Sequence, residues 1–169
     1  LSDRVEGAFR AGSVGAEAIW FISKNASALG GGDARYAIQL LLAAGLMADR
    51  DGSPRILPEH VREAQERMDP RIDREDLLEL SREERDALLA IAKALRIMEE
   101  AFYAPIEAVW GYYKLVCEGR GAEPIGKDSF AAILGKLKAL GIVDIEEGAG
   151  VSLQLMRAKA LEEFLEAGS

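Results

Sequence analysis

The segment KDSFAAILGKLKALGIVDIEEGAGVSLQL, residues 127–155, joins one helix pattern to two strand patterns. Apolar residues recur with helical spacing in its first part, at Phe130, Ile133, Leu134, Leu137 and Leu140. Gly141 is well placed to cap that helix, and residues 142–145 and 151–155 have the composition of short strands around a turn at 146–150. The segment therefore predicts a helix followed by a β-hairpin.

Two helix patterns precede this segment. Ser81 and Glu84 have capping-box spacing at the start of the first, and Pro105 opens the second. The residues expected on their buried faces are Leu88, Ile91, Ala92 and Leu95, then Ile106, Val109, Trp110, Tyr113 and Val116.

Three helices followed by a two-stranded ribbon is the element order of a winged helix, a helix-turn-helix variant. We therefore expect residues 80–169 to form a winged-helix domain with a two-stranded β-wing, closed by an amphipathic helix over 158–166. Trp110 and Tyr113 share a helix face, so we expect them in its core rather than in a base-stacking site.

Four short helices are expected in the first half of the chain. The first ends at Gly12, and the others cover residues 16–28, 34–49 and 58–68, separated by a glycine triplet and a turn at 51–54. The residues expected on their buried faces are Val5 and Phe9, then Ile19, Trp20, Ile22 and Ala26, then Ile38, Leu41, Leu42, Gly45 and Ala48, and finally Val61, Ala64 and Met68.

A charged segment with Pro70 separates the two halves. The expected fold class is therefore mainly α: a small helical bundle over residues 1–68, a linker or connecting helix over 69–79, and the winged helix over 80–169.

Net charge excludes a general basic surface for nucleic acid. The chain carries 21 Lys and Arg against 29 Asp and Glu, a formal charge of -8, so any contact with DNA must be local. A single cysteine and a single histidine give no basis for an internal disulfide, a metal site or a catalytic dyad. We therefore expect no catalytic residue and no metal. No apolar run is long enough for a membrane span, and the absence of a first Met suggests a piece of a longer protein.

Residues 121–128, GAEPIGKD, nearly match the phosphate-binding loop pattern. A helix rather than a strand precedes them. Pro124 removes a backbone donor, Glu123 would repel phosphate, and Asp128 replaces the hydroxyl that holds Mg²⁺. The chain alone is therefore not expected to hydrolyse ATP.

Arg35 breaks a local rule at the start of a helix. Asp33 is placed to cap this helix, and Arg35 then falls in the first turn, where a cation opposes the helix dipole. A residue that breaks such a rule is a candidate for a functional site. The alternative is a surface arginine paired with a nearby carboxylate.

Small residues edged by lysines form the expected outward face of the helix over 127–140. The members of this face and its edges are Lys127, Asp128, Ser129, Ala132, Gly135, Lys136, Lys138 and Ala139. Such a face can enter a DNA major groove, but an ordinary solvated face has the same residue types. Glu146 and Glu147 at the hairpin tip argue against DNA because they would repel phosphate.

Beyond these patterns, nearly all of the chain resembles the C-terminal part of the archaeal origin recognition and cell division control initiators, a family of AAA+ replication initiators. The segments that carry the resemblance are Leu1-Ser-Asp-Arg4 to Phe9, Gly32-Asp-Ala-Arg35 with Ala37-Ile38 and Leu41-Leu42, Glu59-His-Val61, residues 107–115, Pro124-Ile125 and residues 140–143.

The resemblance implies an AAA+ lid followed by a DNA-binding winged helix. Arg35 matches the family's sensor 2 arginine, which reaches the phosphates of ATP held by the preceding ATPase domain. The residues implied to contact DNA are Lys127, Ser129, Ala132, Lys136 and Lys138 on the recognition helix and Gly148, Ala149 and Gly150 in the wing.

The resemblance also implies cofactors and partners. This piece is expected to be no enzyme and to hold no cofactor, whereas the intact protein binds ATP or ADP with Mg²⁺. The implied partners are double-stranded origin DNA, the replicative minichromosome maintenance helicase and the protein's own ATPase domain, with no membrane, in the cytoplasm and on the nucleoid. The chain departs from the family at Gly126, Asp128 and Ser129, where arginines and a Ser or Thr cap are common, and its wing lacks the usual arginine. The alternative function is a winged helix that docks the helicase or another initiator subunit.

Overall fold

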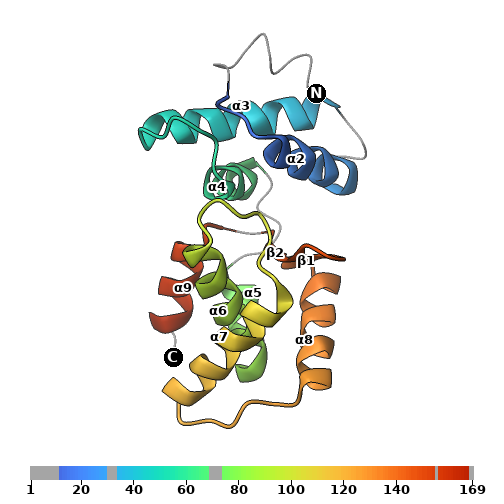
Figure 1. Cartoon of the computed structure of the whole chain (residues 1–169), viewed down its shortest axis with the longest axis vertical. Coiled ribbons are helices and arrows are strands. Elements are labelled where there is room, and N and C mark those ends of the chain that lie inside the picture. The colour runs from blue at the N-terminus through green and yellow to red at the C-terminus, as the bar shows by residue number, and fades with distance from the viewer. Residues whose placement is uncertain (1–11, 30–33, 69–73, 155, 168–169) are drawn as a thin grey trace. The chain divides into compact units, whose positions relative to one another are not determined.

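The computed structural model describes residues 12–29, 34–68, 74–154 and 156–167, and the chain divides into two compact units, Leu1–Asp69 and Pro70–Ser169. The first unit contains α2 (Ala16–Leu29), α3 (Ala34–Arg50) and α4 (Pro58–Met68). The second contains α5 (Arg74–Leu78), α6 (Arg82–Ile97), α7 (Ile106–Gly119), α8 (Lys127–Ala139), β1 (Val143–Glu146), β2 (Gly150–Leu153) and α9 (Ala158–Ala167) (Figure 1). The mainly α fold class with a two-stranded β-wing is confirmed. The helix expected before Gly12 and the cap expected at Asp33 lie outside the described residues.

In the first unit, α3 packs against both α2 and α4. The buried apolar residues of this unit are Ala18, Phe21, Ile22, Ala26, Ala37, Leu40, Leu41, Ala44, Ala48, Ile56, Val61 and Ala64. Two backbone hydrogen bonds hold the loop before α4 in place: Ser53 N donates to Ala48 O at 2.8 Å, and Ile56 N donates to Ser13 O at 2.9 Å. His60, buried in α4, accepts a hydrogen bond from the Leu57 N–H at its Nδ1.

The buried faces of α2 and α3 differ from those expected. Trp20 and Leu42 are each 47% exposed, while Phe21 and Leu40 are fully buried. Ile19 of α2 and Ile38 and Gly45 of α3 are only partly buried, as is Met68 at the end of α4. In α2 and α3, large apolar residues are adjacent in the sequence. Two neighbouring faces of each helix are therefore apolar, and helical spacing alone cannot tell which of them is buried. The packing of the neighbouring helices selects between them.

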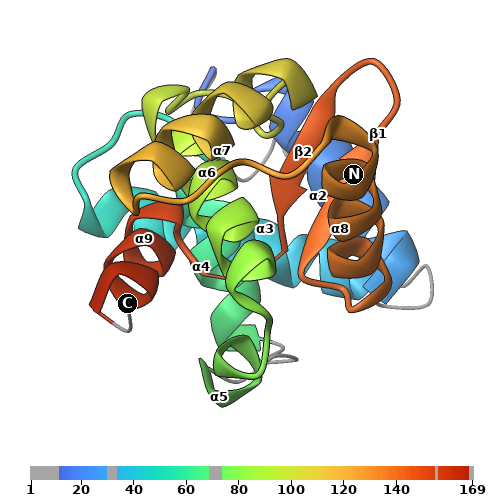
Figure 2. The ribbon, with the colours of Figure 1, turned by 90° about the horizontal axis from the view of Figure 1, so that it is seen from below.

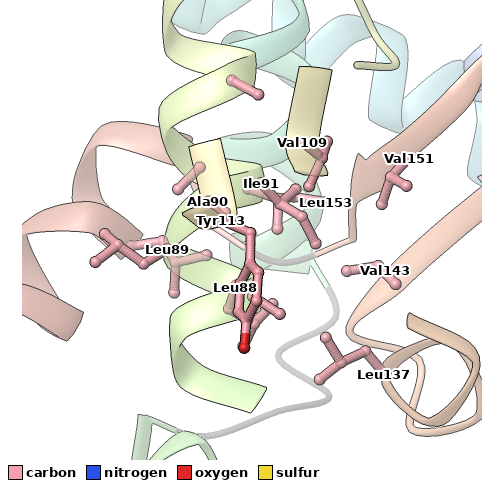
Figure 3. Packing of buried hydrophobic residues seen from close by; sticks show 14 of the residues in the cluster. Leu88, Leu89, Ala90, Ile91, Val109, Tyr113, Leu137, Val143, Val151 and Leu153 are labelled. Atoms are coloured by element: carbon pink, nitrogen blue, oxygen red, sulfur yellow. The ribbon is translucent and has the colours of Figure 1, made fainter. Parts of the chain in front are cut away.

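In the second unit, α6 is the central helix and packs against α7, α8, α9 and β2. Its N-terminus carries the expected capping box: Ser81 Oγ accepts from Glu84 N, and Glu84 Oε2 accepts from Ser81 N at 3.0 Å. Figure 3 shows residues from α6, α7, α8 and both strands meeting in one core, among them Leu88, Ile91, Val109, Tyr113, Leu137, Val143, Val151 and Leu153. Trp110 stacks on Tyr113 at the edge of this core, as expected.

The burial of three residues in the second unit was not predicted correctly or not predicted at all. Leu77 of α5, within the segment expected as a linker or connecting helix, is fully buried in the core. Ile106 and Leu140 were expected to be buried, but they are 43% and 49% exposed. Ile106 is the first residue of α7 and Leu140 caps the end of α8, so neither lies in a helical turn that faces the core. The boundaries 68, 79 and 80 stay predictions.

The junction between α8 and β1 has the hydrogen bonds of a Schellman motif. Gly141, with φ of 74°, donates to Lys138 O at 2.9 Å, and Ile142 donates to Leu137 O at 3.0 Å. β1 then pairs antiparallel with β2, from Val143 opposite Leu153 to Glu146 opposite Gly150. Figure 2 shows α8 beside this hairpin, in agreement with the packing of α8 on β1.

Candidate nucleic-acid interface

The outward face of α8 is open to solvent. Ser129, Ala132 and Gly135 are exposed, as are Asp128 and Ala139. The side chains of Lys127, Lys136 and Lys138 are 63%, 57% and 50% exposed. The structure therefore brings the helix residues predicted to contact DNA to one accessible surface, which we call the α8 face: Lys127, Ser129, Ala132, Lys136 and Lys138.

Lys136 is paired with a buried carboxylate. Its Nζ lies 2.5 Å from Oε1 of Glu84, whose other oxygen closes the capping box of α6. The hydrogen bond from Lys136 is the main reason why the pKa of Glu84 is lowered from its ordinary value, with the bond from Ser81 N adding to it. Glu84 is therefore a fixed negative charge beside the middle of the α8 face.

Lys138 is held by the hairpin. Its Nζ donates to the backbone oxygen of Ile145 at 2.8 Å and lies 3.7 Å from Oδ1 of Asp144. Oδ2 of Asp144 in turn accepts a 2.6 Å hydrogen bond from the hydroxyl of Tyr103. The Asp144 carboxylate is thus fixed from a second side.

Lys127 makes a looser pair. Its Nζ lies 3.3 Å from both oxygens of Glu107, and both side chains are largely exposed. An exposed pair of this kind contributes little to stability and exchanges readily with solvent.

The three predicted wing residues have different surroundings. Gly148 is exposed with φ of 79°, and Ala149 is partly buried. Gly150 is buried, because Val151 exchanges two 2.8 Å backbone hydrogen bonds with Ala104 and brings that segment against the strand. The backbone of Gly150 therefore packs inside the unit, and only the turn before it reaches solvent.

Arg35 is exposed in the first turn of α3, which contains no acidic residue. Gln39, Leu42 and Leu46 follow Arg35 at helical spacing, so they lie on the same face of α3, and all three are exposed. A groove of about 480 Å³ lies beside Leu42 and Leu46 and is lined on its other side by the loop at Ser53–Ile56. This face of α3 could therefore contact another protein surface together with Arg35.

The near match to a phosphate-binding loop does not form a nucleotide site. Residues 120–126 connect α7 to α8, whereas a phosphate-binding loop follows a strand. Asp128 is exposed in the first turn of α8, where a phosphate-binding loop would have a hydroxyl for Mg²⁺. These residues do not fit the phosphates of ATP.

Other chemistry is sparse in the part of the chain that the structure describes. Within residues 12–29, 34–68, 74–154 and 156–167, no three His, Cys, Asp or Glu side chains gather as a metal site. Cys117 is buried in the core of the second unit. None of the described helices is long and apolar enough to cross a membrane.

Sequence reasoning missed the residues that hold the lysines. Glu84 and Tyr103 carry no local signal for this role, because Glu84 lies 52 positions from Lys136 and Tyr103 lies 41 positions from Asp144. Asp144 is close to Lys138 in sequence, but their contact depends on the packing of α8 on β1. The capping box did identify Glu84 as a residue with a defined side-chain position.

Comparison with known proteins gives one match for the first unit and several for the chain. Residues 1–66 match the Cdc6 AAA+ ATPase-type lid domain. An ORC1-type DNA replication protein of Thermococcus kodakarensis is 30% identical over 115 residues, which are 67% of this chain and 27% of that protein. ORC1-type DNA replication protein 2 of Saccharolobus solfataricus is 29% identical over 98% of this chain and 43% of its own length.

A solved structure is similar over both units. The crystal structure of Cdc6p from Pyrobaculum aerophilum matches 98% of this chain with a TM-score of 0.85 and 27% sequence identity, and the match covers 45% of that protein. The chain therefore spans less than half the length of each of these relatives.

Proposed function

Since this chain belongs to the Cdc6 and ORC1-type family of archaeal DNA replication initiators and carries their AAA+ lid, we propose that its winged helix binds duplex DNA at replication origins. The α8 face carries this proposal: it combines small exposed residues, three lysines and an adjacent β-hairpin in one accessible surface. We propose the same division as above, with the lid in residues 1–68 and the winged helix in 80–169.

The proposed contacts follow from the shape and charge of this face. Ala132 and Gly135 allow the axis of α8 to approach the base edges in a major groove. The lysines at the edges of the helix reach phosphates on either side, and Gly148 and Ala149 place the backbone of the wing against the DNA backbone. Gly150 serves this surface by holding the wing to the core.

The lid has a separate role in this proposal. Arg35 reaches from α3 to the phosphates of ATP, which the ATPase domain of the intact protein binds together with Mg²⁺. In this proposal the surface of that ATPase domain also covers Leu42 and Leu46. The intact initiator then helps to load the replicative helicase, while this piece has no enzymatic activity of its own.

Titration of the chain into a labelled origin duplex at low salt tests DNA binding. Replacing both Lys127 and Lys136 with Ala removes up to two phosphate contacts, so the slope of log K against log salt becomes shallower by about 0.9 to 1.8. The control is Arg96→Ala with Lys159→Ala, which removes the same number of positive charges near α9. We expect this control to leave the slope unchanged. No binding at low salt, or an unchanged slope for the α8 pair, contradicts the proposal.

Arg35→Ala tests the assignment of the lid. We expect DNA binding by this chain to be unchanged, because Arg35 lies in the first unit, and we expect a weaker response to ATP in the intact protein. The measurements are the same titration and nucleotide binding by the intact initiator. Loss of DNA binding in the Arg35 variant would overturn this assignment.

A second function is favoured by a specific observation. Each lysine of the α8 face lies beside a carboxylate of its own unit, and the hairpin turn adds Glu147. This charge arrangement suits a winged helix that docks a protein, such as the helicase or another initiator subunit. Capture of the helicase that survives the lysine substitutions would favour docking over DNA binding.

A further inference from the structure

Two carboxylates of the second unit lie beside lysines of the α8 face. Glu84 contacts Lys136 at 2.5 Å and Asp144 lies 3.7 Å from Lys138. Protein carboxylates and DNA phosphates are both anionic oxygen acceptors for a lysine ammonium group. Lys136 Nζ donates to Glu84, while Lys138 Nζ donates to the backbone oxygen of Ile145 and forms an ion pair with Asp144, so both lysines already have partners within the protein.

Both carboxylates are held in place by a second contact. Glu84 is buried and its second oxygen accepts the Ser81 N–H at 3.0 Å. Asp144 is only 17% exposed and its second oxygen accepts the Tyr103 hydroxyl at 2.6 Å. Both charges therefore stay beside the α8 face when DNA approaches, unlike Glu107, which is 79% exposed.

A fixed carboxylate beside a lysine lowers DNA affinity in two ways. It repels the incoming phosphate, and it neutralises the lysine in the unbound protein, so that fewer counterions are displaced from DNA per lysine when the complex forms. An exposed, mobile partner has less effect, because it can turn away into solvent.

We propose that Glu84 and Asp144 are internal competitors of DNA phosphate, which hold Lys136 and Lys138 and set the DNA affinity of the α8 face well below what its lysines would give alone. This inference rests on the proposed DNA binding, and it deepens that proposal by naming the residues that regulate the site.

Glu84→Gln and Asp144→Asn test the competition while keeping the shapes of the side chains. The amide introduced at either position retains an oxygen that accepts the existing bond from Ser81 or Tyr103, so the capping box and the hairpin contact are kept. In duplex titrations we expect each variant to bind about fivefold tighter than the wild type at 50 mM salt, and this advantage should fall to about 1.5-fold at 200 mM because the slope is steeper by about 0.9. The double variant should show both increments.

Glu163→Gln with Glu166→Gln is the matched control. These two carboxylates also pair with lysines, Lys159 at 3.9 Å and Lys93 at 2.7 Å, and their loss changes the net charge by the same amount as the double variant. They lie on α9, which the two views place on the opposite side of α6 from α8 (Figures 1 and 2). We expect this control to change the affinity for DNA by less than twofold. Thermal unfolding of each variant checks that it is folded.

The outcomes separate this inference from the proposed function. If the wild type binds through its α8 lysines but both substituted variants bind no tighter than the control, the competition is overturned and DNA binding stands. Weaker binding by the two variants also overturns it, because the carboxylates would then position the lysines for DNA. If no protein binds, the proposed function fails and the inference fails with it. If only the double variant binds, the proposed function of the wild type fails, while the competition by the two carboxylates is supported.

Discussion

Gly150 occupies a position in which a side chain does not fit. Its φ is 120°, and an ideal Cβ there would lie 2.0 Å from the backbone oxygen of Ala104. We expect Gly150→Ala to destabilise the second unit by about 2 kcal/mol or more, because the substitution strains the backbone and forces the Ala104 segment away from the strand. Urea unfolding followed by circular dichroism measures the change.

Gly135 on α8 provides the control for this substitution. An ideal Cβ at Gly135 meets nothing within 4 Å, and the residue lies inside a helix. Gly135→Ala should therefore stabilise the protein by about 0.5–1 kcal/mol, since alanine loses less backbone entropy on folding. Equal effects of the two substitutions would show that the contact with Ala104 does not restrict position 150.

At the scale of the element, α6 depends on its capping box. Ser81 Oγ accepts the Glu84 N–H at 3.3 Å, which satisfies one of the donors at the start of the central helix. Ser81→Ala should cost about 1 kcal/mol in unfolding free energy. Chemical denaturation of the purified chain gives this value.

Ser129 is a suitable comparison for Ser81. It lies near the start of α8, but the N-cap of that helix is Gly126, which has no side-chain cap bond, and Ser129 is exposed. Ser129→Ala should change stability by less than about 0.5 kcal/mol. A loss as large as that of Ser81→Ala would mean that the measured cost is not due to capping.

At the scale of the whole molecule, the described residues form a core in each of the two compact units. Leu40 of the first and Leu137 of the second are both fully buried, so truncation of either to Ala should cost about 2–5 kcal/mol in its own unit. Hydrogen exchange resolved by peptide measures each unit separately. Leu40→Ala should raise exchange in α3 and α4 and leave α6 and α8 protected, while Leu137→Ala should do the reverse. Faster exchange in both units for either variant would show one cooperative fold.

Local sequence by itself determined the type and nearly the ends of the described helices other than α5. Residues 16–28, 34–49 and 58–68 were expected as helices, and the structure has Ala16–Leu29, Ala34–Arg50 and Pro58–Met68. These ends depend on signals within a few residues, such as the turn after Arg50 and the proline at the start of α4. The hairpin and the cap at Gly141 were predictable for the same reason.

Only the tertiary structure decided which faces are buried and which charges meet. Helical spacing could not choose Phe21 over Trp20, because adjacent apolar residues offer two equivalent faces until a neighbouring helix packs on one. The order of α6, α7, α8 and the hairpin was predictable from sequence, but the contact of Lys136 with Glu84 depends on how α8 packs against α6. The sequence therefore determined that this face has lysines, and packing determined that carboxylates hold them, since ion pairs form between groups that the fold brings within about 4 Å.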